Sequence, residues 1–219
     1  MSYPIPYVTT STARGERTVD VYSRLLADRI IYLGTEIDDG VANVLIAQLL
    51  HLESEAESSP INLYINSPGG SISAMLAVYD AMRYVTAPVH TTCVGQAVAG
   101  SAVLLAGGEP GSRAILRHGR VVLHQPAAQG RGTIPDLILE AEEIARVRSL
   151  LEEILAADTG HTAEKVRTDT ERDLVLTAEQ ARDYGIVDVV IDTRGAHREG
   201  VGEEAAAVLG DAQEARAAT

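Results

Sequence analysis

The sequence contains no phenylalanine, no tryptophan, a single cysteine and a single lysine. The core must therefore be built from Leu, Val, Ile and Ala, with eight tyrosines supplying all of the aromatic surface. One cysteine cannot form an internal disulfide, so nothing indicates an oxidising compartment. Cys93 falls in the middle of a predicted strand, which indicates a small buried apolar side chain rather than a reactive thiol.

Long apolar runs and basic clusters are also absent. No run reaches the roughly 18 residues that a membrane-spanning helix needs, and the first residues have neither a basic head nor an apolar core of secretory length. The formal net charge of −13 disfavours nucleic acid or an anionic membrane surface as the main partner. We therefore expect a cytoplasmic protein with no nucleic-acid and no membrane partner.

A length of 219 residues and an apolar content of 46% suit one globular domain with short appendages. Residues 1–18 carry prolines and small hydroxylic residues, which predicts a flexible or partner-ordered arm. Residues 19–194 hold the predicted strands and helices. Residues 195–219 are dominated by Ala, Glu and Gly, a composition typical of a disordered acidic tail.

The first half of the domain alternates strand and helix with short connections. Strands are predicted at 29–33, 61–66 and 89–93, and helices at 44–52, 72–84 and up to 106. This order predicts an α/β fold with parallel strands and right-handed crossovers. Two strand-to-helix turns, at Gly69-Gly70 and at Gln96 to Gly100, consist of glycine or other small residues. Such turns meet at the carboxyl ends of parallel strands, where ligands bind.

The second half is less regular. Short strands are predicted at 114–116 and 120–123, a long helix from Ile134 to about Ala157, shorter helices at 162–168 and 177–184, and a last strand at 187–191. The long helix carries an apolar stripe at helical spacing. This pattern fits a core helix and a helix that projects toward another subunit equally well.

Four residues have both an ordinary and a functional interpretation. His124 follows a predicted strand and fits a hydrogen-bonded structural histidine as well as a catalytic base. Asp173, in Glu-Arg-Asp, fits a solvated run of charges. Gly69 and Gly70 fit a tight turn, which is compatible with close approach of their backbone to a ligand.

Several segments together resemble the proteolytic subunit of the Clp protease, the ClpP family, from about Arg14 to Asp192. The matching segments are Arg14-Gly15-Glu16-Arg17, Tyr22-Ser23-Arg24-Leu25-Leu26, Tyr64-Ile65-Asn66-Ser67-Pro68-Gly69-Gly70, Gly95-Gln96-Ala97, His124-Gln125-Pro126, Asp169-Thr170-Glu171-Arg172-Asp173 and Tyr184-Gly185 to Asp188. So many matches in one order are specific, whereas Ser-Pro-Gly-Gly alone would be weak. The resemblance implies a ClpP/crotonase-type α/β fold of repeated βα units with a protruding handle, a strand plus the long helix, at about 127–157.

The resemblance also implies an assembly and a site. Subunits of that family form stacked seven-membered rings from identical or paralogous chains, the N-terminal arm is axial, and hexameric ATPases of the ClpX, ClpA or ClpC type feed in unfolded polypeptides. Its serine peptidase triad falls on Ala99 at the nucleophile position, His124 as base and Asp173 as the group that orients the base. The oxyanion hole falls on the backbone N–H groups of Gly70 and Gly100, and the ATPase docking site on Tyr64 and Tyr84. No metal and no cofactor is implied.

Ala99 departs from this pattern at the point where chemistry would occur. A methyl group has neither a lone pair nor a proton, so it cannot attack a carbonyl, and the family-type serine peptidase is expected to be silent. An active peptidase would need Ser101 as nucleophile or an engineered Ser→Ala change at position 99. Two positions along a helix turn the Ser101 side chain by roughly 200° away from His124, and several departures from the family pattern together favour natural divergence over engineering. A third hypothesis is a crotonase-type acyl-CoA enzyme, since that superfamily shares the fold and the paired N–H oxyanion hole. It is disfavoured because His124, Asp173 and the docking tyrosines would then have no reason to match a protease.

Overall fold

In the computed structural model, which describes residues 4–12, 15–126 and 132–192, one seven-stranded sheet organises the chain. Five of its strands are parallel and lie side by side in the order β3 (Ile30–Leu33), β4 (Ile61–Ser67), β5 (Val89–Val98), β6 (Arg113–Leu116) and β9 (Val189–Ile191). The α/β class and the parallel pairing are therefore confirmed.

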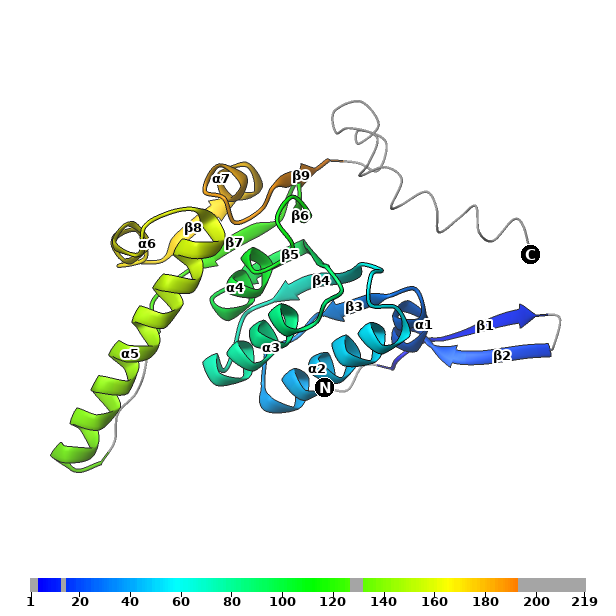
Figure 1. Ribbon diagram of the computed structural model, residues 1–219, viewed down its shortest axis with the longest axis horizontal. Helices are drawn as coiled ribbons and strands as arrows, with labels where there is room; N and C mark the ends of the chain where they lie inside the picture. The colour runs from blue at the N-terminus through cyan, green and yellow to red at the C-terminus, as the bar shows by residue number, and fades with distance from the viewer. Residues whose placement is uncertain (1–3, 13–14, 127–131, 193–219) are drawn as a thin grey trace.

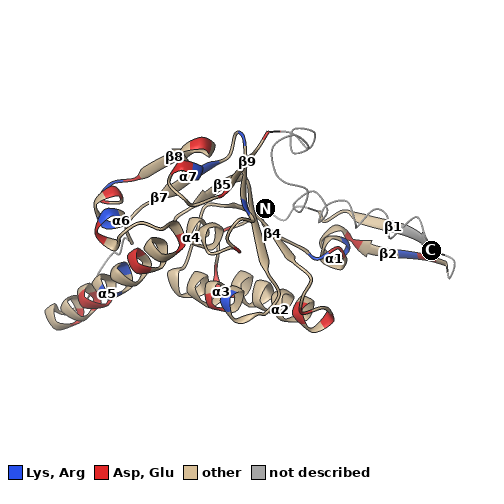
Figure 2. Cartoon of the chain, turned by 45° about the horizontal axis from the view of Figure 1, so that its top comes forward, with Lys and Arg blue, Asp and Glu red and all other residues tan. Residues whose placement is uncertain are grey.

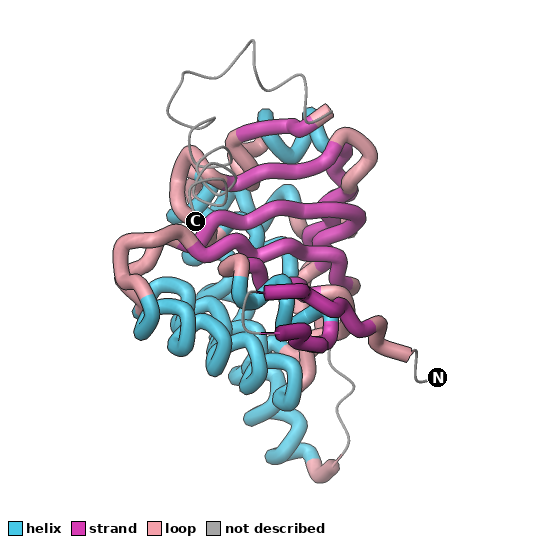
Figure 3. The backbone as a smooth tube through the Cα atoms, turned by 90° about the vertical axis from the view of Figure 1, so that its right-hand side faces the viewer, coloured by secondary structure: helices cyan, strands magenta, loops and turns pink. Residues whose placement is uncertain are grey.

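Helices α2 (Asp39–Glu55), α3 (Ile72–Tyr84) and α4 (Gly100–Ala106) lie on the same side of this sheet (Figure 1). Figure 3 shows the strands side by side in magenta. Along β4 the side chains of Ile61, Leu63 and Ile65 are buried toward the helices, whereas Asn62 and Tyr64 alternate with them and are half-buried. The core consists of aliphatic side chains from both layers, as a sequence without Phe and Trp requires. None of the helices in the described ranges is both long and apolar enough to cross a membrane.

Strand β5 is long enough to serve two neighbours. Its first half, Thr91–Cys93, pairs with β6, and its second half, Gln96–Val98, pairs with β7 (Arg120–Leu123). Strand β7 pairs in turn with the antiparallel β8 (Leu174–Thr177). Because β7 runs parallel to the end of β5, His124, which follows β7, is brought beside the turn at Ala99, which follows β5.

Helix α5 (Ile134–Thr159) projects from the body (Figure 1). A capping box of Thr133 and Asp136 and a proline in the first turn start it, and Gly160 ends it with a left-handed φ of 76°. Its only buried residues, Glu152 and Leu155, belong to its second half, while Ile138 and Leu139 in its first half are exposed. The first half of α5 therefore projects from the body, whereas its second half packs against the core, and contact with another subunit stays a prediction. The predicted handle strand falls partly on 127–131, outside the described residues.

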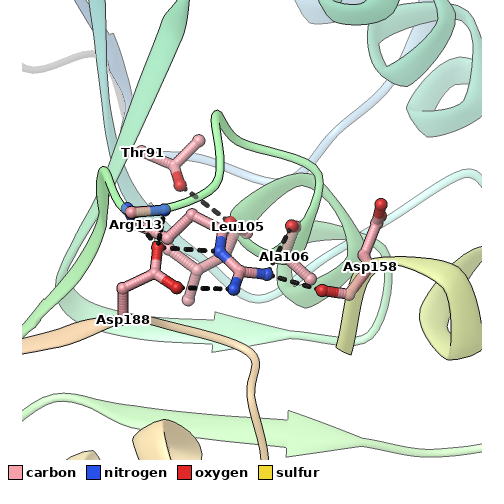
Figure 4. A network of polar contacts seen from close by, with 7 residues as sticks. Thr91, Leu105, Ala106, Arg113, Asp158 and Asp188 are labelled. Atoms are coloured by element: carbon pink, nitrogen blue, oxygen red, sulfur yellow. Dashed lines mark hydrogen bonds and ion pairs between the residues drawn. The ribbon is translucent and has the colours of Figure 1, made fainter. Parts of the chain in front are cut away.

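A buried arginine ties the end of α5 to the sheet (Figure 4). Arg113 Nη2 forms an ion pair with Asp188 at 2.6 Å, while its Nη1 donates to the carbonyl oxygens of Ala106 at 3.1 Å and Asp158 at 2.7 Å. Burial acts to raise the pKa of Asp188, but the hydrogen bonds from Arg113 outweigh it, so the pKa is lowered. Tyr79 of α3 donates to the Asp158 carboxylate at 3.0 Å.

Four elements differ from the sequence prediction. Within the predicted arm at 1–18, residues form an antiparallel hairpin, β1 (Tyr7–Thr12) with β2 (Gly15–Asp20), in which Thr9 and Thr18 hydroxyls bond across the strands at 3.0 Å. The hairpin lies at the end of the molecule opposite the tip of α5 (Figure 1). Helix α1 (Val21–Ala27) and strand β8 were not predicted either. The remaining helices, α6 (Ala163–Asp169) and α7 (Ala178–Asp183), lie close to their expected positions.

Candidate active site

Ala99 stands at a strained turn between β5 and α4. Its φ of 51° and ψ of −117° make it one of two non-glycine residues with positive φ in the described ranges, the other being Arg29. The turn is held from both sides: Ala99 N donates to Val122 O at 2.8 Å, and Ala99 O accepts from Ala102 N at 3.0 Å. A strained residue between a strand and a helix is the geometry that presents a nucleophile in α/β hydrolases. The backbone conformation is therefore kept although the side chain is a methyl group.

The two small-residue turns meet, as the topology predicted. A Cβ on Gly69 would lie 2.5 Å from the Val98 carbonyl oxygen and 3.2 Å from the Ala99 methyl carbon, so the first turn is packed directly against the second. Together with His124, the residues Gly70, Ala99 and Gly100 line one cavity of about 200 Å³. Four of the predicted site residues thus share a single pocket.

Among the described residues, the predicted oxyanion donors, the N–H groups of Gly70 and Gly100, have no acceptor. On either side of Gly70 the chain bonds to Ile37, which donates to Gly69 O and accepts from Ser71 N, each at 2.8 Å. This pairing turns the Gly70 N–H away from Ile37, and a Cβ at Gly70 (φ 150°) would overlap the Ile37 backbone. Gly100 is the first residue of α4, where an N–H has no intrahelical acceptor. Within the described ranges neither amide donates a hydrogen bond.

His124 follows β7 and is placed beside the turn by the β5–β7 pairing. Its Nδ1 lies 3.0 Å from the backbone oxygen of Gln125. Because a carbonyl oxygen can only accept, a hydrogen bond there requires the Nδ1–H tautomer. Nε2 then keeps its lone pair, as a general base requires.

Asp173 is close to His124 in the sheet but is not bonded to it. Leu123 and Leu174 are partners in the antiparallel β7–β8 ladder, so the next position of this register pairs His124 with Asp173. No hydrogen bond or ion pair between the two side chains is found in the part of the chain that the structure describes, and Asp173 does not line the cavity. The strands place the predicted acid and base opposite one another without joining their side chains.

The hydroxyl group of Ser101 is hydrogen-bonded to the backbone of the turn. Its side chain is fully buried, and its Oγ accepts from Val98 N at 2.7 Å and lies 2.9 Å from Ser67 O and 2.8 Å from Val98 O. It does not line the cavity that holds His124. The expectation that Ser101 points away from His124 is confirmed, and the hypothesis that it replaces the nucleophile has no support in this geometry.

The two predicted docking tyrosines lie on different elements. Tyr64 is half-buried on the face of β4 that the core helices do not cover, and Tyr84, the last residue of α3, is 77% exposed. No ring contact joins them among the described residues.

Comparisons with known proteins agree with this geometry. The sequence model of the family described as Clp protease matches residues 13–194, which is most of the chain. The chain belongs to the Clp protease family. A Clp protease proteolytic subunit 1 from Nocardia farcinica is 61% identical over 195 residues, covering 89% of this chain and 99% of the relative. Proteolytic subunit 2 from Streptomyces avermitilis is 56% identical (88% and 97% covered), and subunit 4 from Rhodococcus jostii is 55% identical (86% and 97% covered).

These matches make the chain a Clp subunit of the proteolytic type, with the α/β fold of that family. None of them supports the crotonase-type acyl-CoA enzyme, whose basis was a shared fold and a shared pair of oxyanion-hole N–H groups. The family assignment concerns the scaffold, and the state of the nucleophile position has to be judged from Ala99 itself.

We expect Ser101→Ala to lower the free energy of unfolding of this Clp subunit by about 2 kcal/mol, because the buried Val98 N–H and Ser67 carbonyl lose their partner. Urea unfolding measures the change. The matched control is Ser54→Ala, since the exposed Ser54 hydroxyl bonds only the carbonyl of His51 on its own helix. Equal and small effects of both substitutions would contradict a structural role for Ser101.

We expect Ala99→Gly to raise the free energy of unfolding by about 1 kcal/mol, because glycine adopts positive φ without the strain that a Cβ adds. Ala97→Gly, two residues earlier on β5 and without positive φ, is the control and should destabilise. Thermal or urea unfolding of the three proteins gives both differences. A loss of stability in both variants would mean that the turn at Ala99 stores no strain.

The sequence analysis missed two charged residues that line the same cavity. Arg148 and Glu152 of α5 line the pocket. Arg167 of α6 does not line it but donates a hydrogen bond to Glu152. The i, i+4 spacing of Arg148 and Glu152 was visible in the sequence and indicates an ion pair on one helix face. Nothing in the sequence indicated that this face would close a pocket beside Ala99.

Proposed function

We propose that this chain is a catalytically silent proteolytic-type subunit that works within a larger Clp assembly. The observation that carries the proposal is the methyl group of Ala99 at the apex of a strained strand-to-helix turn, in one cavity with Gly70, Gly100 and His124. A methyl group cannot form an acyl-enzyme, and the hydroxyl of Ser101 is bonded elsewhere. The remaining groups of the site bind and position a peptide, but none of them supplies an atom that attacks its carbonyl carbon.

The assembly that we propose follows the family pattern. Stacked seven-membered rings combine this chain with active paralogous subunits, a hexameric Clp ATPase docks at Tyr64 and Tyr84, and unfolded polypeptides are the substrates, in the cytoplasm. The exposed apolar side chains near the tip of α5 support a contact between rings, because exposed apolar clusters are typical of interaction surfaces. The members of this cluster are Ile134, Leu137, Ile138 and Leu139.

Casein degradation tests both parts of the proposal. The purified chain with a Clp ATPase and ATP should leave casein intact. Adding it to an active paralogous subunit should give a mixed complex on size-exclusion chromatography and change the rate of casein loss. Degradation by the chain alone would show that it is active, and failure to enter any complex with active paralogues would contradict the assembly role.

A further inference from the structure

The cavity beside Ala99 has a second side built from helices. An apolar wall from α3, α4, β7, α5 and α6 encloses it, and α5 supplies one charged end, where the described charged residues are Arg148 and Glu152 (Figure 2 shows the interspersed charges of α5 and α6). The apolar wall consists of Met75, Val103, Leu123, Leu151, Leu155 and Val166. A volume of about 200 Å³ is below the roughly 300 Å³ at which sites for drug-sized ligands begin, so it suits one amino-acid side chain.

Glu152 already has its charge compensated, because each of its oxygens is bonded to an arginine. It is 4% exposed; Oε1 accepts from Arg148 Nε at 2.7 Å and Oε2 accepts from Arg167 Nε at 2.8 Å. Burial acts to raise the pKa of Glu152, but the hydrogen bonds from Arg167 and Arg148 outweigh it, so the pKa is lowered. The carboxylate is therefore ionised at neutral pH and holds the two arginines in place.

Arg148 is the group left with free donors. Only its Nε is used, and within the described ranges its two Nη atoms donate to no acceptor, while its side chain is 30% exposed. Two guanidinium groups share one carboxylate, and Glu164 of α6 also acts on the more exposed Arg167, so the unbalanced positive charge at the cavity is that of Arg148. A guanidinium with a free edge binds a carboxylate through paired, charge-assisted hydrogen bonds.

We propose that this cavity binds a peptide side chain with an apolar stem and a carboxylate end, glutamate above all, and that Arg148 selects it. The methylene groups lie along the apolar wall, and the carboxylate accepts from the free Nη groups of Arg148. A lysine side chain meets the positive charge of Arg148, and the charge of Glu152 is already compensated by two arginines. The inference rests on the proposed function in one respect, that the cleft beside Ala99 binds peptides.

Three peptides that differ in one residue test the preference on the unmodified full-length protein. They are acetyl-Leu-Leu-Glu amide, acetyl-Leu-Leu-Gln amide and acetyl-Leu-Leu-Lys amide, in which the terminal amide removes any second carboxylate. Ligand-detected NMR titrations give each Kd. We expect the Glu peptide to bind about tenfold more tightly than the Gln peptide, and the Lys peptide to bind no better than the Gln peptide. Equal Kd values for Glu and Gln, or no saturable binding of the Glu peptide, would overturn the inference.

A matched pair of variants assigns the preference to Arg148. Arg148→Gln should make the Glu and Gln peptides equal without changing the affinity for the Gln peptide. Arg146→Gln removes the same charge from an exposed residue of α5 that pairs with Glu143, and should keep the preference. A preference that survives Arg148→Gln would assign it to another group and overturn the role of Arg148. Peptide hydrolysis by the unmodified chain would contradict the proposed lack of catalysis but would not change which peptide binds more tightly. A failure of the proposed function is therefore distinguishable from a failure of the glutamate preference.

Discussion

Ala99→Ser is expected to convert this chain from a silent subunit into a peptidase, with a gain in kcat/KM of at least about a thousandfold on a fluorogenic peptide. Removing the nucleophile of a serine protease costs on the order of a million-fold in turnover, so returning it gives a large signal even if only part of that factor is regained. The turn at position 99 already has a strained φ of 51°, and the N–H groups of Gly70 and Gly100 donate no hydrogen bond within the described ranges. The variant therefore adds the missing hydroxyl beside the oxyanion donors and His124.

The orientation of His124 determines how much of the million-fold turnover factor Ala99→Ser regains. Its Nδ1 faces the Gln125 carbonyl rather than the Asp173 carboxylate. A carbonyl selects the useful tautomer but stabilises the imidazolium less than a carboxylate does. We therefore expect less than the full million-fold unless His124 turns to Asp173 in the assembled protein.

A double variant controls the experiment. Ala99→Ser combined with His124→Ala should return activity to the level of the unmodified chain, because a serine hydroxyl without a base is a poor nucleophile. Equal activity of the single and double variants would show that His124 is not the base. No gain in Ala99→Ser would show that the scaffold has lost more than its nucleophile.

Arg113→Ala is expected to lower the free energy of unfolding by about 3 kcal/mol, the largest stability effect that we predict. Removing one partner of a buried ion pair leaves the other charge without compensation, at a cost of about 3–5 kcal/mol, and we take the lower value because Asp188 is 22% exposed. The same change frees the carbonyl oxygens of Ala106 and Asp158 (Figure 4). Urea unfolding followed by circular dichroism measures the loss.

Arg117→Ala is the matched control, since Arg117 pairs with Asp192 after the same two strands but is 61% exposed. An exposed pair is worth less than about 1 kcal/mol.

The pKa of Asp188 is lowered in the folded protein. Its ion pair therefore contributes fully to stability above the unfolded pKa of about 3.9, and this contribution is lost as pH falls through the lower folded pKa. The difference between Arg113→Ala and the unmodified protein should thus be constant from about pH 8 to 5 and shrink below about pH 4.

Much of the fold could be predicted because local patterns and topology agree. Helix α3 and strand β7 begin and end where periodicity placed them, and the parallel order followed from alternating strands and helices. The meeting of the turns at Gly70 and Ala99 followed from the rule that ligands bind at the carboxyl ends of parallel strands.

The rest depends on contacts that no local pattern carries. Strand β8 is short, and its position is fixed by pairing with β7, more than fifty residues earlier in the chain. The role of Ser101 depends on the Ser67 carbonyl, which the fold brings to it from the preceding strand. Arg148 lines the pocket because tertiary packing places α5 beside the turn at Ala99.

Labelling with a fluorophosphonate probe tests the absence of a nucleophile most directly. Intact-mass analysis of the unmodified full-length chain should show no adduct, while Ala99→Ser under the same conditions should gain one adduct that peptide mapping places on residue 99. An adduct on the unmodified chain, on Ser101 or on any other serine of the cleft, would contradict the account, because it would reveal an attacking oxygen where the structure has only a methyl group.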